Sequence, residues 1–187
     1  YAPYPDADGQ DLLSLLGRAL VENGLDVVTG FGAGVGPFLL NGALEALEAN
    51  GTHSLHDRVT LRPFPQGVAD PKVRAERWLA YRQTMISEAG IALFVFGNQG
   101  ADGATELAEG VEQEFEVARE KGLLLVPVGA TGHMAQRLHE RVMADLSTLF
   151  PGRPEWHGPL AALGQDTDVA SLVERTVALV LTMSREA

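Results

Sequence analysis

Residues 27–38 read VVTGFGAGVGPF, and this stretch decides how the chain is expected to fold. A β-branched run, typical of a strand, passes into four glycines at alternate positions and then into a helix-compatible segment. Glycine lacks a Cβ, so such a loop adopts positive φ and brings backbone N–H groups close to an anion, which the following helix N-terminus also favours. The stretch therefore predicts a strand, a phosphate-binding loop and a helix.

The glycine spacing by itself leaves an alternative open. No glycine lies three residues after Gly34, so the stretch is not the G-x-G-x-x-G fingerprint of dinucleotide-binding proteins. A tight strand-to-helix turn that binds nothing would have the same composition. The rest of the chain has to decide between the two.

Composition limits the classes of protein to consider. The 187 residues are 45% hydrophobic and 21% charged, which fits one globular domain over residues 1–187 with a sizeable core. A formal net charge of −11 disfavours binding to nucleic acid or anionic membranes. The chain has no cysteine, no histidine pattern for a metal, and no apolar run near the ~20 residues that span a bilayer. We expect a soluble, cytoplasmic protein without a metal or cofactor.

Helical and strand patterns alternate along the chain. Helices are predicted over residues 11–22, 37–48, 73–88, 106–120, 131–149 and 169–183. Strands are predicted over residues 25–29, 58–64, 91–96 and 123–128, with a glycine-rich loop over 98–103. The last two strands are apolar throughout, as in strands that are buried on both faces. The pattern predicts an α/β, Rossmann-like parallel sheet with helices on both faces.

In such folds a ligand binds outside the carboxyl ends of the strands. Four loops follow the predicted strands and share that edge: residues 30–36, 63–66, 97–103 and 129–132. Three side chains near them suit a nucleotide. Arg82 can pair a phosphate, although taken alone a solvated helix arginine or a partner of Glu88 is the more common role. Glu114 can accept ribose hydroxyls or belong to a solvated acidic helix face, and Thr131 can contact phosphate or simply cap a helix.

The order of these loops resembles a known family. The segments that carry the resemblance are residues 28–36, 62–66, 81–85, 94–98, 114–118 and 127–132. Together they resemble the SLOG superfamily, and more closely its branch associated with Sir2 or TIR domains in antiphage effectors of the Thoeris type (STALD). The resemblance covers residues 12–183.

The resemblance implies a regulatory domain that binds a cyclic ADP-ribose-type nucleotide made by a TIR enzyme. Binding would activate a covalently linked Sir2 or TIR domain that degrades NAD, within a homo-oligomer, dimer or tetramer. The chain would then be the C-terminal part of a longer effector. The ligand-binding set implied is Gly30, Phe31, Gly32, Gly34, Val35, Gly36, Arg82, Gly97, Asn98, Gln99, Glu114, Thr131 and Gly132. Arg82 would hold phosphate, Glu114 a ribose, and Thr131 with Gly132 the far phosphate.

Two features depart from the family pattern. Gln99 stands where related effectors often have a lysine, which removes one positive charge from the implied site. The family's first strand, with its Gly-Ser motif, is expected before Tyr1.

Two other classes of protein stay open. Phosphoribohydrolases of the same superfamily cleave nucleoside monophosphates with an arginine and a glutamate, which Arg82 and Glu114 would match. Those enzymes carry a Pro-Gly-Gly-x-Gly-Thr-x-x-Glu segment, whereas residues 96–103 here read FGNQGADG. The third class is an oligomerisation module that binds no ligand.

Overall fold

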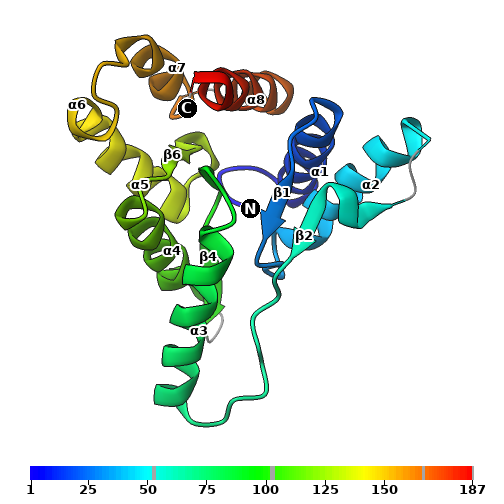
Figure 1. Ribbon diagram of the computed structural model, residues 1–187, viewed down its shortest axis with the longest axis vertical. Helices are drawn as coiled ribbons and strands as arrows, with labels where there is room; N and C mark the ends of the chain where they lie inside the picture. Colours follow the sequence, from blue (N-terminus) through cyan, green and yellow to red (C-terminus); the bar gives the residue numbers. More distant parts are fainter. Residues whose placement is uncertain (52–53, 102–103, 166, 187) are drawn as a thin grey trace. The chain divides into compact units, whose positions relative to one another are not determined.

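A computed structural model describes residues 1–51, 54–101, 104–165 and 167–186 of the chain (Figure 1). The chain divides into two compact units. The terminal unit comprises Tyr1–Gly9 and Gly90–Ala187, and the middle unit comprises Gln10–Ala89. The division falls within the first helix, α1 (Asp6–Glu22).

The middle unit contains one parallel pair of strands. Strand β1 (Val27–Thr29) pairs with β2 (Val59–Leu61), and helix α2 (Gly36–Ala49) with the short turn η1 (Leu55–Asp57) connects them. The unit ends with α3 (Pro71–Ile86), whose N-terminus is capped by Asp70 through bonds from the backbone N–H groups of Lys72 and Val73. Its buried core joins α1, α2 and β2 through Val21, Ala43, Ala46, Leu47 and Val59.

Two glycines let α1 and α2 pack at very short range. A Cβ at Gly42 would lie 1.7 Å from the carbonyl oxygen of Ser14, and one at Gly17 would lie 2.1 Å from that of Leu39. Real Cβ atoms do not approach backbone so closely, so both positions require glycine. This contact fixes α2 and, with it, the end of the glycine loop.

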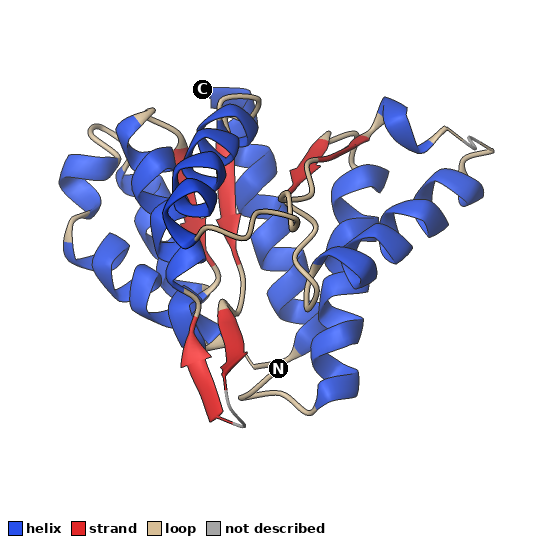
Figure 2. Cartoon of the chain, turned by 90° about the horizontal axis from the view of Figure 1, so that it is seen from below, coloured by secondary structure: helices blue, strands red, loops and turns tan. Residues whose placement is uncertain are grey.

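The terminal unit holds a second parallel pair, β3 (Ile91–Phe94) with β6 (Leu124–Pro127) (Figure 2). Between them lie an antiparallel hairpin, β4 (Asn98–Ala101) with β5 (Ala104–Leu107), and helix α4 (Glu109–Glu120). After β6 come η2 (Gly129–Thr131), α5 (His133–Ala144), α6 (Leu146–Leu149), η3 (Pro154–Trp156), α7 (His157–Ala162) and α8 (Val169–Glu186). Helix α4 packs on β3 and β6, and α5 packs on β6.

The predicted α/β class with parallel strands is confirmed, but several details differ. The four strands form two hydrogen-bonded pairs among the described residues rather than one sheet. The loop predicted over residues 98–103 is wrong for residues 98–101, because Asn98–Ala101 forms a strand that pairs with Ala104–Leu107. Residues 102 and 103 of the predicted loop lie outside the described residues. That pairing also delays the helix predicted from residue 106 until Glu109.

The helix predicted over residues 131–149 begins two residues later and is interrupted at Asp145. Gly132 has φ of 75°, which is not helical, so α5 begins at His133. A turn at Asp145 then separates α5 from α6. No helix among the described residues has the length and apolar character needed to cross a membrane.

Candidate functional site

The loops at the strand ends contain all the non-glycine residues with positive φ that the described chain holds. Phe31 follows β1 with φ of 54°, Phe96 follows β3 with φ of 54°, and His133 follows β6 with φ of 52°. An ordinary side chain in this region costs of order 1 kcal/mol or more, and such residues cluster where structures bind ligands. In each unit the strained residues therefore follow a strand, which is where an α/β fold is expected to bind a ligand.

The predicted site residues fall in both units. The glycine loop and Arg82 belong to the middle unit, whereas Gly97, Asn98, Gln99, Glu114, Thr131 and Gly132 belong to the terminal unit. The structure brings residues together within each unit, and each group is described by itself.

In the middle unit the glycine loop makes a compact turn. The N–H groups of Val35 and Gly36 both donate to the Gly32 carbonyl, at 3.0 and 2.7 Å. A Cβ at Gly36 would lie 2.7 Å from Phe31 Cα, so this position must remain glycine. Gly32 and Gly34 have open space where a Cβ would stand, which leaves their backbone accessible.

Arg82 contacts the same aromatic ring, Phe64, as the start of this loop. Its side chain comes from α3, one turn before Met85, whose sulfur lies 3.4 Å from the Cβ position of Gly30. The residue is only 6% exposed, and its guanidinium carbon is 4.9 Å from the centroid of the Phe64 ring. The sequence analysis assigned no role to Phe64, although an aromatic residue in a strand-exit loop was the available signal.

Of the two simple alternatives for Arg82, the solvated helix arginine is wrong. A solvated helix arginine would be exposed, and Arg82 is buried. Glu88 has another partner, because Arg62 donates to it through Nε at 3.2 Å and Nη2 at 2.9 Å. Arg82 is thus a buried cation whose guanidinium lies against the Phe64 ring.

In the terminal unit the loops after β3 and β6 are joined by the Thr131 hydroxyl. It accepts a bond from Phe96 N–H at 2.8 Å and donates to the Val128 carbonyl at 2.7 Å. The Phe96 carbonyl in turn accepts from Ala135 N–H at 2.8 Å. Thr131 is fully buried, and Gly132 holds the N-cap position of α5, so the expected capping role of the threonine is wrong.

We predict that Thr131→Val lowers the free energy of unfolding by about 1–3 kcal/mol, because the Phe96 N–H and Val128 carbonyl would lose a buried partner. The measurement is urea unfolding of the chain at 25 °C. Thr131→Ser is the matched control, since it keeps the hydroxyl and should cost less. Equal losses for valine and serine would contradict this role of the hydroxyl.

Gly97 and Glu114 are placed by helix α4 in the same unit. A Cβ at Gly97 would lie 2.7 Å from Met134 Cβ and 3.3 Å from Val111 Cγ1. Glu114 follows Val111 by three residues on α4 and therefore shares the helix face that approaches Gly97. Asn98 and Gln99 begin β4 opposite Leu107 and Glu106, and both are exposed.

The first residues of the chain pack against the loop after β6. A Cβ at Gly132 would lie 3.0 Å from Pro3 Cδ and 3.1 Å from the Ala2 carbonyl oxygen. A phosphate at Gly132 would therefore have to displace Ala2 and Pro3. The centroid of the Tyr1 ring lies 5.2 Å from that of the Phe96 ring.

The His133 imidazole also lies near the start of the chain. Burial lowers its pKa, and the N-terminal charge lowers it further, whereas a hydrogen bond with the Ala2 backbone raises it.

The acidic face of α4 is not simply solvated, as the alternative for Glu114 assumed. Glu112 pairs with Arg141 at 3.4 Å and with Arg137 at 3.7 Å, and Glu116 also pairs with Arg141. The Arg141 guanidinium carbon lies 4.8 Å from the centroid of the Phe115 ring. These contacts join α4, which carries Glu114, to α5, which follows Gly132.

The Glu116 carboxyl gives the terminal unit a pH-dependent contribution to stability. The pKa of Glu116 is lowered, mainly by a hydrogen bond from Arg141. Burial raises this pKa, whereas a hydrogen bond from Arg119 lowers it further. Since the folded-state pKa is the lower one, the contribution is complete above the unfolded value, near pH 4–5, and is lost as the pH falls through the folded value.

We therefore expect Glu116→Gln to cost up to about 1 kcal/mol of unfolding free energy at pH 7, with the difference from wild type shrinking toward pH 3. Urea unfolding at several pH values measures it. Glu120→Gln, on the same helix and exposed, is the matched control and should leave the unfolding free energy at pH 7 nearly unchanged. A difference that stays constant with pH would contradict the assignment.

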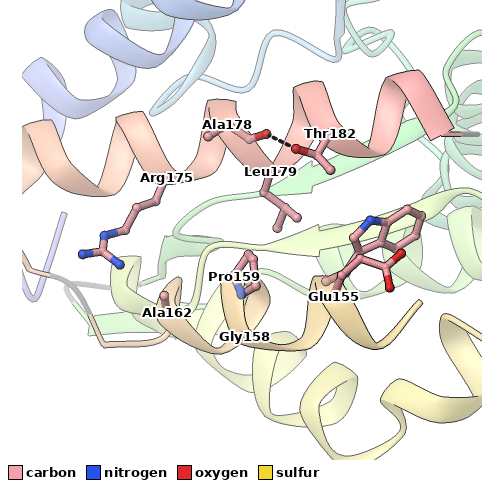
Figure 3. A pocket seen from close by; sticks show the side chains of 9 residues that line it. Glu155, Gly158, Pro159, Ala162, Arg175, Ala178, Leu179 and Thr182 are labelled. Carbon is pink, nitrogen blue, oxygen red and sulfur yellow. Dashed lines mark hydrogen bonds between the residues drawn. The ribbon is translucent and has the colours of Figure 1, made fainter. Parts of the chain in front are cut away.

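A pocket of about 440 Å³ lies between α7 and α8, away from these loops in the terminal unit (Figure 3). Ala162, Ala178 and Leu179 contribute apolar lining, and Arg175 and Glu155 are its charged lining residues. One arginine with an acid in the same pocket does not suit a polyanion. None of the predicted site residues lines it.

Comparison with known proteins places the chain in a defined class. The model of the Sir2- and TIR-associating SLOG family (STALD) matches residues 1–183, and the chain belongs to this family. The resemblance noted in the sequence is therefore confirmed.

Particular relatives are NAD(+) hydrolases named ThsA. The chain is 38% identical over 152 residues to the protein of Bacillus cereus (strain MSX-D12), which covers 81% of the chain and 31% of that relative. It is 33% identical over 163 residues to the protein of Acinetobacter baumannii (strain 532279), covering 83% of the chain and 34% of the relative. The chain thus spans about a third of the length of these curated relatives.

Proposed function

We propose that this domain is a regulatory sensor that binds a cyclic ADP-ribose-type nucleotide and thereby activates a linked NAD-degrading domain of the Sir2 or TIR class in antiphage defence. The observation that carries the proposal is the buried cation Arg82, whose guanidinium carbon lies 4.9 Å from the centroid of the Phe64 ring that contacts the start of the glycine loop at Gly30. Its support comes from the family, whose members are associated with Sir2 and TIR domains, and from relatives that are NAD(+) hydrolases.

The middle unit supplies the contacts for phosphate. Arg82 presents a planar guanidinium, which suits two oxygens of one phosphate group. The residues of the glycine loop surround the ligand: Gly30, Phe31, Gly32, Gly34, Val35 and Gly36. The N–H groups of Phe31, Val35 and Gly36 hold the shape of the loop, because they are bonded to the Thr29 hydroxyl and the Gly32 carbonyl.

The terminal unit carries the other residues that we expect to contact nucleotide, and they are described by themselves. Glu114 accepts hydrogen bonds from a ribose, and Gly97, Asn98 and Gln99 line the same loop. Gly132 lies at the second phosphate, while Thr131 holds the loop in place, since its hydroxyl is already bonded inside the unit. The neutral Gln99 gives the loop after β3 one positive charge fewer than a lysine at the same position would give it.

Activation follows from differential affinity. A nucleotide that binds one packing of the homo-oligomer, a dimer or tetramer, more tightly than another shifts the population toward it. The linked catalytic domain is active in the packing that the nucleotide favours.

The test is NAD consumption by a protein that carries this chain together with its Sir2 or TIR domain. A cyclic ADP-ribose isomer is expected to raise the rate, and Arg82→Ala is expected to abolish the response at the same nucleotide concentration. A rate that ignores every nucleotide in the panel would contradict the proposal. Repeated release of free base from AMP or cytokinin nucleotides would instead favour the phosphoribohydrolase class.

A further inference from the structure

Phe64 contacts the cation on which the proposed nucleotide site depends. The Arg82 guanidinium carbon lies 4.9 Å from the centroid of the Phe64 ring and 5.9 Å from that of Trp78. Because Arg82 is 6% exposed, its charge has lost most of its hydration. Attraction between a cation and an aromatic face is strongest at such desolvated positions. The Phe64 ring therefore stabilises the charge of Arg82 where the charge is buried.

The position of the Phe64 ring is itself fixed by α3 and by its own loop. Its centroid lies 5.9 Å from that of Trp78, nearly edge to face, and 5.8 Å from that of Tyr81. The Trp78 indole N–H donates to the carbonyl of Pro65 at 2.8 Å, which ties the loop to the helix. Two aromatic contacts and one hydrogen bond thus hold the ring over the guanidinium.

Phe64 also reaches the glycine loop. A Cβ at Gly30 would lie 2.8 Å from Phe64 Cε2, so the edge of the ring rests on the Gly30 backbone. One side chain therefore contacts both the first glycine of the loop and the buried arginine. The spacing between these two elements depends on the phenyl ring.

We propose that Phe64 is the positioning residue for Arg82, holding the guanidinium in the orientation that binds a phosphate of the nucleotide. This inference rests on the proposed function. The contact with Phe64 is made between a cation and an aromatic ring, whereas a guanidinium pairs with phosphate oxygens through N–H groups in its own plane, so the two contacts use different parts of the group. The contact with Phe64 also restricts the rotamers of a long side chain before binding, which reduces the entropy lost on binding.

A double-mutant cycle on the chain tests the inference. Affinity is measured by calorimetric titration, at up to millimolar concentration, with whichever of ADP-ribose, NAD and the cyclic ADP-ribose isomers the wild type binds most tightly. Phe64→Leu keeps an apolar side chain but removes the aromatic face, and it is expected to weaken binding about tenfold. In the Arg82→Ala background the same change is expected to have little further effect, because Phe64 acts through Arg82.

Two further variants separate positioning from general stability. Phe64→Tyr keeps the ring and is expected to bind within about twofold of the wild type. Phe150→Leu removes a comparable aromatic contact, with Trp156, in the terminal unit, and is expected to lower stability without changing affinity. Additive losses in the cycle, or no loss for Phe64→Leu, would overturn the inference and leave the proposed function intact. A wild type that binds no nucleotide would overturn both.

Discussion

Replacing Gly42 by alanine is expected to lower the free energy of unfolding by about 3 kcal/mol or more. The added Cβ would lie 1.7 Å from the Ser14 carbonyl oxygen and 3.0 Å from the Arg18 backbone nitrogen. Neither atom belongs to a flexible side chain, so α1 and α2 would have to separate. Urea unfolding at 25 °C measures the loss.

The loss of stability expected for Gly42→Ala is opposite in sign to the usual effect of replacing glycine by alanine in a helix. Within an exposed helix, glycine to alanine stabilises by about 1 kcal/mol, because alanine loses less backbone entropy. Gly158→Ala in α7 is the control, since no heavy atom lies within 4 Å of its Cβ position, and it should leave stability unchanged or slightly higher. A stable Gly42→Ala variant would show that the two helices are not in close contact.

Arg82→Ala is expected to weaken nucleotide binding by about 2–4 kcal/mol, the loss typical of removing one partner from a desolvated charged contact. Its buried position is the reason for the large value, because an exposed arginine would contribute far less. Titration calorimetry with the cyclic ADP-ribose isomers measures the change.

Arg77→Ala, on the same helix and exposed, is the matched control for charge. It should change affinity by well under 1 kcal/mol, and the difference should shrink further at high salt. An unchanged affinity for Arg82→Ala would remove this residue from the site. Equal losses for the two variants would point to net charge alone.

Patterns that act over a few residues predicted much of the fold. Asp70 and Pro71 give the start of α3 a cap and a first residue without an N–H, and the predicted helix differs there by two residues. The β-branched and apolar runs identified all four parallel strands. The glycine loop was correctly placed between β1 and α2.

Features set by tertiary contact were not predictable in the same way. The sequence predicted a glycine-rich loop over residues 98–103 and a helix from residue 106. The hairpin was missed because it arises from the register of β4 with β5, Gln99 with Glu106. Arg141 was not singled out, because its pairing with Glu112 and Glu116 joins two helices that are distant in sequence. Thr131 was expected at a cap, and only the structure shows its hydroxyl bonded to Phe96 N–H.

Thermal unfolding of the wild-type chain with ADP-ribose, NAD and the cyclic ADP-ribose isomers tests the central claim most directly. A ligand at a hundred times its Kd adds about 2.7 kcal/mol, which raises the Tm by about 5–10 °C for a chain of this size. The account predicts such a shift with one cyclic isomer and its loss in Arg82→Ala. A Tm that no nucleotide in the panel changes would contradict it.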